Sequence, residues 1–280
     1  MDLTEAPNTM VAPAAATGRE FWIDEPKNLE VTDPRCGKVN RGLAISGNAL
    51  YAGTLDGKLI SLDAAKGRLQ WETVVVDFRR RRALTHAPLV IRDKELVGTA
   101  GGELGIRASL AAYDTQTGKE VWRFKTIPEP GHESWSGESW KHGGGPIWLT
   151  GSDDPGLNLK HWGVGNPGSD WNPRVRPCDS LHASSAMALD ADTGQRKWHF
   201  QFSPHDEWDW GAEQTPLLVD REWQGWPIRA EGRGRSRQGT RTFPGVQGGT
   251  NWFAPTDRRR PCSPRGIRSW HRVSGTWAVG

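Results

Sequence analysis

One short phrase recurs four times along the chain. It consists of apolar residues, a short turn ending in Thr-Gly or Lys-Gly, and a tryptophan four positions after the glycine. The copies are APAAATGREFW, SLDAAKGRLQW, AYDTQTGKEVW and ALDADTGQRKW, which end at Trp22, Trp71, Trp122 and Trp198. Each copy predicts two short strands around a tight turn, in which glycine supplies a positive φ and Asp caps neighbouring N–H groups.

These copies are spaced like the sheets of a β-propeller. Their glycines stand 49, 51 and 76 residues apart, and blades of about four strands recur every ~40 to 50 residues. A tryptophan at a fixed place can fill the gap between adjacent sheets while its N–H reaches a backbone carbonyl. We therefore predict an all-β chain that forms a partial β-propeller; chance recurrence of a common hairpin turn is the alternative. The longer third interval predicts an insertion between Trp122 and Trp198.

The composition agrees with an all-β chain and excludes several classes of protein. The 280 residues include 16 Trp, 34 Gly and 19 Pro but only 2 Tyr. No apolar run approaches the ~18 residues of a membrane span, and residues 1–5 lack the features of a secretory signal. Because Trp22 closes a repeat whose earlier strands are missing, we expect the N-terminus to be internal. No C-x-x-C-H motif or zinc-like cysteine spacing occurs, so covalent haem is not expected.

The net charge of +3 hides an asymmetry. Residues 221–280 contain 12 Arg, no Lys and 3 acidic residues, which leaves the first 220 residues at −6. An Arg-rich end can indicate nucleic-acid binding. The Arg clusters at 233–237 and 258–261 have neither a folded motif nor regularly placed aromatic residues. A solvated or non-native tail is therefore the favoured interpretation, and no nucleic-acid partner is expected.

Strand-like runs alternate with turns through the first half of the chain, and they predict strands within 42–54, 58–63, 88–100 and 109–114. After Trp122 the pattern changes to the long Gly, Trp and acid-rich stretch IPEPGHESWSGESWKHGGGPIW. Long irregular segments in a repeat scaffold usually carry function. The strand pattern is not expected to resume after Val219, so the predicted propeller stops before it closes.

Three side chains with oxygen donors lie in glycine-flanked turns at successive blade ends: Glu103, Asn166 and Asp209. A divalent cation such as Ca²⁺ needs carboxylate and amide oxygens gathered from several loops, although each residue taken by itself is more typical of an ordinary turn cap. The run Gly143-Gly144-Gly145 before Trp148 would let the backbone approach a flat aromatic ligand. A glycine hinge beside a docking tryptophan explains the same residues.

Several longer blocks resemble one family. GGELGIR, GESWKHGGGPIW, GVGNPG and PHDEWDW are similar to segments of the pyrroloquinoline quinone (PQQ) dependent alcohol dehydrogenases, the quinoprotein methanol and ethanol dehydrogenases. VNRGLAISGNALYAGTLDGKLISLDA and GVQGGTNWFAP extend the resemblance over roughly residues 10–255. The blocks occur in the family's order and alternate with its tryptophan-docking repeats.

The resemblance implies an eight-bladed propeller, about half of it present here, with PQQ on the axis beside a metal ion. By this resemblance Glu103 and Asn166 are metal ligands, Asp209 is the catalytic base and a further ligand, and Trp148 stacks beneath the quinone. It also implies oxidation of a small primary alcohol, an external electron acceptor such as a cytochrome c, and a periplasmic location. The further positions that match cofactor-binding residues are Arg41, Thr85, Asn251 and Cys36.

The chain also departs from the family. Many relatives have two adjacent cysteines before VNRG, whereas this chain has Arg35-Cys36, so that disulfide cannot form. Gly211 stands where lanthanide-using relatives have another carboxylate, which favours Ca²⁺. A strand pair between Val219 and Trp226, with an Arg that contacts the quinone, is expected to be absent. Residues 1–255 are predicted to form the partial propeller, and 256–280, which resemble a product of a shifted reading frame, a non-native or disordered tail.

Two further interpretations remain open at this point. An incomplete propeller exposes sheet edges, which favours aggregation or partial disorder over a working site, so the chain could be an inactive member of the family. A cofactor-free propeller that serves as an interaction scaffold is the alternative function. Scaffold relatives lack the Glu, Asn and Asp set, which this chain keeps, so the enzyme interpretation is preferred.

Overall fold

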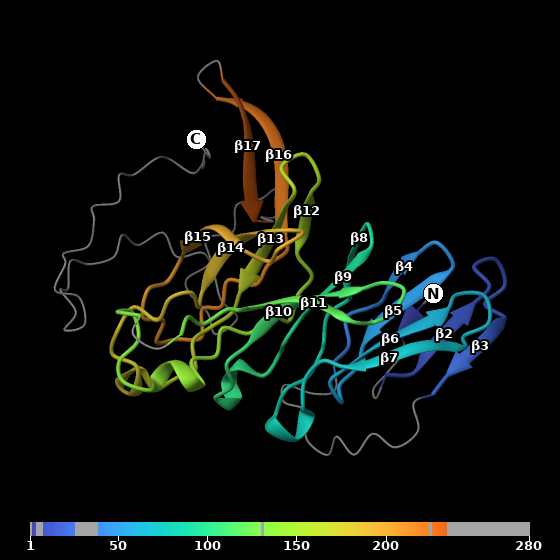
Figure 1. Ribbon diagram of the computed structural model, residues 1–280, viewed down its shortest axis with the longest axis horizontal. Helices are drawn as coiled ribbons and strands as arrows, with labels where there is room; N and C mark the ends of the chain where they lie inside the picture. Colours follow the sequence, from blue (N-terminus) through green and yellow to red (C-terminus); the bar gives the residue numbers. More distant parts are fainter. Residues whose placement is uncertain (1, 4–7, 26–38, 130–131, 224–225, 234–280) are drawn as a thin grey trace.

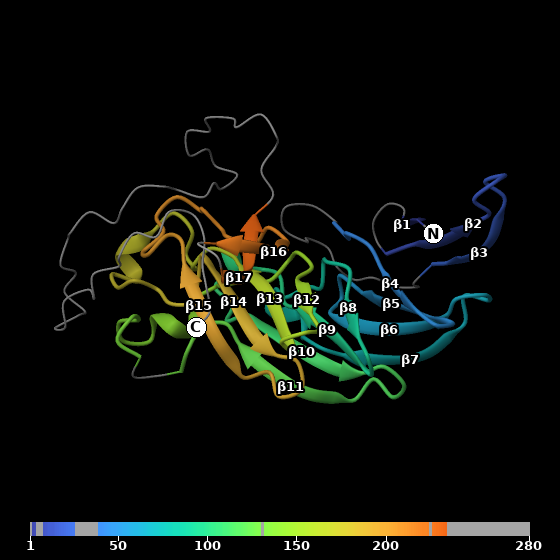
Figure 2. The same cartoon turned by 90° about the horizontal axis from the view of Figure 1, so that it is seen from above.

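The computed structural model describes residues 2–3, 8–25, 39–129, 132–223 and 226–233. In this part of the chain the strands form five antiparallel sheets, here numbered 1 to 5 in chain order. Figures 1 and 2 show sheets 1 to 4 side by side, each formed by consecutive strands. Among these residues, no helix has the length and apolar character that crossing a membrane requires.

Sheets 2, 3 and 4 each have four strands, whereas sheet 1 has three and sheet 5 has two. Sheet 1 contains β1 (Asp2–Leu3), β2 (Met10–Pro13) and β3 (Glu20–Asp24). Sheet 2 contains β4 (Ala44–Ser46), β5 (Ala49–Gly53), β6 (Lys58–Asp63) and β7 (Leu69–Val74). Sheet 3 contains β8 (Leu89–Ile91), β9 (Lys94–Gly98), β10 (Ser109–Asp114) and β11 (Glu120–Lys125).

Sheet 4 contains β12 (Ser152–Asp154), β13 (Leu159–Val164), β14 (Ser185–Asp190) and β15 (Arg196–Gln201). Sheet 5 is the hairpin of β16 (Pro216–Trp223) and β17 (Trp226–Arg233). Short 3₁₀ turns interrupt the connections at η1 (Phe78–Arg80), η2 (Gly102–Leu104), η3 (Ser139–His142) and η4 (Pro173–Val175).

The recurring phrase forms the last hairpin of each of the first four sheets. In every copy the tryptophan lies opposite a small residue of the preceding strand, and a β-bulge follows directly after that residue. In three of the turns an Asp carboxylate accepts hydrogen bonds from the next backbone N–H groups, as Asp114 does from Gln116 and Thr117 at 3.1 and 2.8 Å. The predicted hairpins are therefore confirmed.

The tryptophans join neighbouring sheets as the spacing predicted. The indole Nε1 atoms of Trp22, Trp71 and Trp122 donate to backbone carbonyls of the next sheet's turn at 3.2, 3.1 and 3.1 Å. Each ring also covers the glycine of that turn so closely that an added Cβ would lie 2.6, 2.5 and 2.4 Å from ring atoms. We call these three residues the docked tryptophans.

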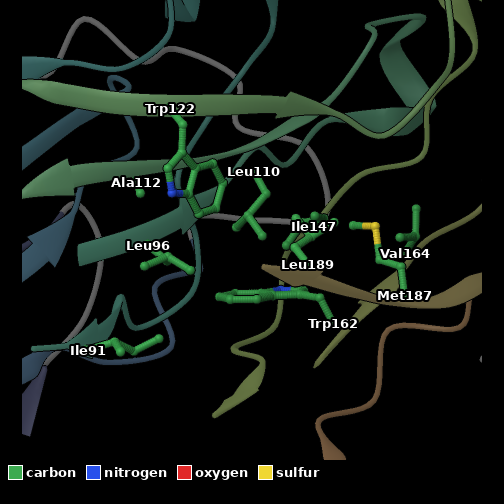
Figure 3. Packing of buried hydrophobic residues seen from close by; sticks show 10 residues of the cluster. All are labelled: Ile91, Leu96, Leu110, Ala112, Trp122, Ile147, Trp162, Val164, Met187 and Leu189. Atoms are coloured by element: carbon green, nitrogen blue, oxygen red, sulfur yellow. The ribbon is translucent and has the colours of Figure 1, made fainter. Parts of the chain in front are cut away.

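The apolar core is divided into clusters between neighbouring sheets. One cluster joins sheet 3 to sheet 4, and Figure 3 shows its residues: Ile91, Leu96, Leu110, Ala112, Trp122, Ile147, Trp162, Val164, Met187 and Leu189. Other clusters join sheet 2 to sheet 3, around Leu59 and Val97, and sheet 1 to sheet 2, around Met10 and Leu62. Each sheet therefore packs mainly against its sequence neighbours, as in other repeat architectures.

The expectation that strands end at Val219 is wrong. β16 continues to Trp223, and β17 pairs with it along its whole length, from Pro216 opposite Arg233 to Trp223 opposite Trp226. The apolar and charged residues of β17 alternate over only a few positions, and Pro227 and Gly232 are uncommon in strands, so the sequence signal for this hairpin is weak. β16 also contacts β12 and β13 of sheet 4.

Candidate active site

The predicted site residues lie on loops rather than strands. Glu103 belongs to the 3₁₀ turn η2 after β9, Asn166 follows β13, and Asp209 lies between β15 and β16. Gly101 and Gly105, on either side of η2, have φ of +108° and +68°, values that side chains disfavour. The chain therefore turns sharply on both sides of Glu103.

The glycine run before Trp148 brings two of these loops together. Gly145 N–H donates to the Asn166 carbonyl at 2.9 Å, and Gly165 N–H donates to the Pro146 carbonyl at 2.9 Å. An added Cβ on Gly102, beside Glu103, would lie 2.5 Å from the Pro146 ring. The segment 143–148 therefore packs between the loop of Glu103 and the loop of Asn166, and the absence of side chains at Gly102, Gly145 and Gly165 permits this approach.

Asn166 is buried, and its amide is held by the same loop. Its Nδ2 donates to Asp170 Oδ1 at 2.5 Å, whereas the side-chain oxygen accepts no hydrogen bond from the described residues. Burial, followed by the charge of Glu103, raises the pKa of Asp170 to about 6. A carboxyl and an amide oxygen thus lie near Glu103, which is the kind of donor set that hard cations prefer.

Asp209 shares this electrostatic environment. Burial first, and then the charges of Asp170, Asp206 and Glu103, together raise its pKa to about 7. The residue has φ of 61°, an uncommon backbone conformation for an amino acid other than glycine. The loops therefore bring together Glu103, Asn166 and Asp209, which are remote in sequence.

The predicted cofactor residues Arg41, Thr85 and Trp148 form a second group. The Arg41 guanidinium lies 4.8 Å from the centre of the Trp148 ring, and the Arg41 N–H donates to the Thr85 carbonyl at 2.9 Å. The Thr85 hydroxyl is buried and makes no hydrogen bond with the described part of the chain. A buried hydroxyl without a hydrogen-bond partner destabilises the fold unless a ligand or a water molecule forms a hydrogen bond with it.

A buried carboxyl that sequence reasoning missed connects the two groups. Glu213 is 3 % exposed, and an added Cβ on Gly165 would lie against its Oε1. Burial raises the pKa of Glu213 well above its usual value, the Arg41 charge and the Trp148 backbone N–H lower it, and the charges of Glu103 and Asp209 raise it. No motif marks Glu213 or Asp170 in the sequence, so nothing there could have identified them.

Two predicted residues lie outside the described part of the chain. Cys36 and Asn251 fall in the segments 26–38 and 234–280, so their roles stay predictions. Among the described residues, no three His, Cys, Asp or Glu side chains gather closely enough to hold one metal ion. The predicted ligand set contains only two carboxylates of that group, with an amide as its third member.

Comparison with known proteins identifies the family. The family model described as glucose/ethanol/alcohol dehydrogenase, β-propeller domain, whose name is PQQ, matches residues 3–231. The chain belongs to this family. Quinoprotein relatives include the quinohaemoprotein alcohol dehydrogenase ADH IIB of Pseudomonas putida, 38% identical over 78% of this chain and 34% of the relative.

Other members of the quinoprotein family agree with this assignment. Subunit 1 of the methanol dehydrogenase [cytochrome c] of Methylorubrum extorquens is 35% identical over 77% of this chain and 39% of that protein. A europium-containing methanol dehydrogenase has a similar structure, with a TM-score of 0.74, 33% identity, and coverage of 81% of this chain and 44% of that one. The chain thus spans roughly a third to two-fifths of the curated relatives it matches.

Proposed function

We propose that this chain carries the cofactor and metal side of a site that oxidises a primary alcohol with PQQ and Ca²⁺. One observation supports the proposal. The charge of Glu103 raises the pKa of Asp209, and both charges raise the pKa of Glu213, which Arg41 and the Trp148 backbone N–H lower. Because the chain spans less than half of its relatives, the activity of the whole protein and its substrate are part of the proposal.

The acidic group suits a cation. The charge of Glu103 raises the pKa values of Asp170 and Asp209, and the charge of Asp170 also raises that of Asp209. A bound divalent ion would offset this repulsion. Carboxylate and amide oxygens are ligands that Ca²⁺ accepts from loops in flexible geometry. A relative whose name includes europium shows that lanthanides also serve in this family. We favour Ca²⁺ because Gly211 supplies no extra carboxylate.

The second group suits a flat, anionic cofactor. Trp148 offers a ring for stacking, Arg41 offers a cation beside it, and the Thr85 hydroxyl has an unused hydrogen-bonding capacity. The glycines at 143–145 place backbone rather than side chains along the same segment. When bound, PQQ supplies a quinone carbonyl that accepts hydride from the alcohol's α-carbon.

The chain's own residues would position the alcohol and remove its hydroxyl proton. Asp209 accepts that proton as general base, and the alcohol leaves as the aldehyde after losing one proton and one hydride. A cation held by Glu103, Asn166 and Asp209 would lower the raised pKa of Asp209 and keep the carboxylate ionised. Arg41, Thr85 and Trp148 would hold the cofactor in place through charge, hydrogen bonding and stacking.

Electrons must then leave to an acceptor outside this chain. A relative's name pairs methanol dehydrogenase with cytochrome c, and we propose a c-type cytochrome as the acceptor and the periplasm as the compartment. An inactive family member or a cofactor-free interaction scaffold is the competing proposal.

The decisive experiment is reconstitution of the purified chain with PQQ and Ca²⁺. We expect cofactor retention, measured by quinone absorbance after gel filtration, and dye reduction with a primary alcohol. Asp209→Asn should retain PQQ but lose at least about 10²-fold in rate, because it removes the general base. Glu103→Ala should lose Ca²⁺-dependent retention, whereas Glu20→Gln on the exposed strand β3 should match the parent chain.

The outcomes separate the proposals. Retention without turnover in the parent chain would indicate an inactive family member. Failure to retain PQQ at any Ca²⁺ concentration would contradict the enzymatic proposal and leave the scaffold. Equal rates for the parent chain and Asp209→Asn would exclude Asp209 as the base.

A further inference from the structure

Basic side chains gather at one end of the interface between sheets 2 and 3. Arg123 and Lys125 stand two residues apart on β11, so their side chains lie on the same face of sheet 3. Arg123 donates to the Val75 carbonyl, which follows the last strand of sheet 2, at 3.3 Å. This face of sheet 3 is therefore turned toward sheet 2, and Lys125 lies at its end.

Two further arginines come to the same place from the connecting segments. Arg107 precedes β10, and its Nε donates to the Ile127 carbonyl at 2.8 Å. Arg82 belongs to the connection between sheets 2 and 3. Burial first, and then the charges of Arg123, Arg82 and Arg107, lower the pKa of Lys125 to about 8. We call these four residues the basic cluster.

Within the basic cluster, Arg123 has partners in its own sheet. Its Nη2 lies 2.5 Å from Glu120 Oε2 and 2.6 Å from the Tyr113 hydroxyl. Its Nε donates to the same carboxylate at 3.1 Å. Glu120 therefore neutralises Arg123, and the other three cations of the cluster need a different counter-charge.

These three cations form no ion pair with the described residues: Arg82, Arg107 and Lys125. Asp77 and Glu129 act on Arg82 and Arg107 through charge at longer range. Asp77 already pairs with Arg80 at 3.7 Å, and Glu129 is exposed. The described carboxylates therefore leave an excess of positive charge at this place.

Two guanidinium nitrogens of the basic cluster also lack an acceptor. Arg82 Nε and Arg107 Nη2 are buried and make no hydrogen bond with the described residues. The Arg107 guanidinium lies 5.0 Å from the centre of the Trp140 ring, which holds it in position. A buried charged donor without an acceptor destabilises the fold. Lys125 is only half-buried, so solvent has access to the cluster along its side chain.

We propose that the basic cluster binds a small oxyanion of the phosphate or sulfate class between Arg82, Arg107 and Lys125. Guanidinium and ammonium groups form strong, charge-assisted hydrogen bonds with the oxygens of such anions. A small ion fits this place better than an acidic protein does, because the nitrogens without acceptors are buried.

The anion would stabilise the loop that carries Glu103. Ala83, next to Arg82, accepts a hydrogen bond from the Ala100 N–H at 2.9 Å, and Arg107 follows the same loop on its other side. An anion shared by the two arginines would therefore connect both ends of this loop to sheet 3. Binding of the anion needs neither PQQ nor alcohol, so it can be tested independently of the proposed oxidation.

Thermal unfolding of the full 280-residue chain in increasing sodium phosphate, with ionic strength held constant by sodium chloride, tests the proposal. We expect the midpoint to rise and to saturate at low millimolar phosphate, whereas the general stabilising effect of phosphate does not saturate. Lys125→Met and Arg82→Met should each need at least about tenfold more phosphate for the same rise, because each removes a charged hydrogen bond. Lys119→Met is the matched control, since it removes an exposed lysine at the other end of the same hairpin.

Measurements in sodium chloride alone separate loss of the site from loss of the fold. Because its neighbours repel Lys125, Lys125→Met should unfold at no lower temperature than the parent chain there. A parent chain without a saturable response to phosphate would overturn the proposal, and so would an equal response in Lys125→Met or a weakened one in Lys119→Met. Stabilisation by poly-L-glutamate but not by phosphate would also overturn it, and would indicate an acidic macromolecule as the partner.

Discussion

The hairpins that carry the docked tryptophans and the loops that carry the candidate site place opposite kinds of side chain in the interior. At the hairpins, indole rings cover glycines and every docked N–H finds a carbonyl. At the loops, Asp209, Asp170 and the buried Glu213 have raised pKa values, and the buried Thr85 hydroxyl makes no hydrogen bond with the described residues. The packing of the first region stabilises the fold, whereas the buried polar groups of the second region are typical of a binding site.

This difference indicates how the fold supports a site. Groups that are buried without partners destabilise a folded chain, and they persist where a ligand satisfies them or where the surrounding structure compensates. Here the compensation comes from a contact that the chain repeats between successive sheets. The site can therefore hold several unfavourable groups, because the scaffold around it repeats a stabilising tryptophan contact.

The largest effect should follow from removing a docked tryptophan. Trp122→Ala should lower the free energy of unfolding by about 3 to 5 kcal/mol, because it removes a buried ring and leaves a cavity between sheets 3 and 4. Trp198→Ala should cost less, because that ring covers no glycine turn among the described residues. Urea denaturation of both variants checks the comparison, and equal losses would show that docking adds nothing.

A smaller effect should follow from filling the turn that receives an indole. Gly194→Ala should destabilise by about 2 to 4 kcal/mol, which combines the strain of a positive φ with the displacement of the Trp122 ring. Gly18→Ala carries only the strain, about 1 kcal/mol. The difference between their midpoints in thermal unfolding, on dilute samples, isolates the ring contact. A difference near zero would contradict the close packing of Trp122 on Gly194.

In the loops of the candidate site, Glu213→Gln should raise the free energy of unfolding by an amount that depends on pH. The folded chain holds the Glu213 proton to a higher pH than the ordinary value of 4.5, so this stabilising contribution is complete below that pH and is lost as pH rises toward the folded pKa. The free energy of unfolding of the variant, relative to that of the parent chain, should therefore rise by at most about 1.4 kcal/mol per pH unit in that window. Parallel stability curves from pH 4 to pH 8 would show that Glu213 is not buried.

The smallest effect should come from Thr85→Val. The buried hydroxyl makes no hydrogen bond in the described chain, so its removal should change stability by less than about 1 kcal/mol in either direction. If the hydroxyl serves the cofactor, the same variant should weaken PQQ retention several-fold. Thermal unfolding and gel filtration with PQQ measure the two effects. A large loss of stability would show instead that the hydroxyl belongs to the scaffold.

Most of the fold could be predicted from the sequence because its repeats are local. The Thr-Gly or Lys-Gly turn fixes a hairpin, and the tryptophan four residues later identifies the contact with the next sheet; both are present in four copies. β6 (Lys58–Asp63) and β10 (Ser109–Asp114) have the predicted bounds. β17 was missed because Pro227 and Gly232 weaken the strand signal of its short apolar and charged alternation.

Less of the site could be predicted from residues alone. Glu103, Asn166 and Asp209 were marked by their glycine-flanked turns, but their convergence depends on how Gly145 and Gly165 bring separate loops together. Glu213 has no local signal, because its burial is decided by the closeness of Gly165 and Gly163. Long-range approach of backbone segments is a property of the packed sheets and is not encoded at any one position.

The direction of the tryptophan contacts also bears on synthesis by the ribosome. Each docked indole donates to a carbonyl that is translated later, 42 to 69 residues further along the chain. At ordinary rates of elongation this delay is on the order of 10 s per sheet. During translation every emerging sheet completes the one before it, so only the newest sheet on the nascent chain is exposed to chaperones at any moment.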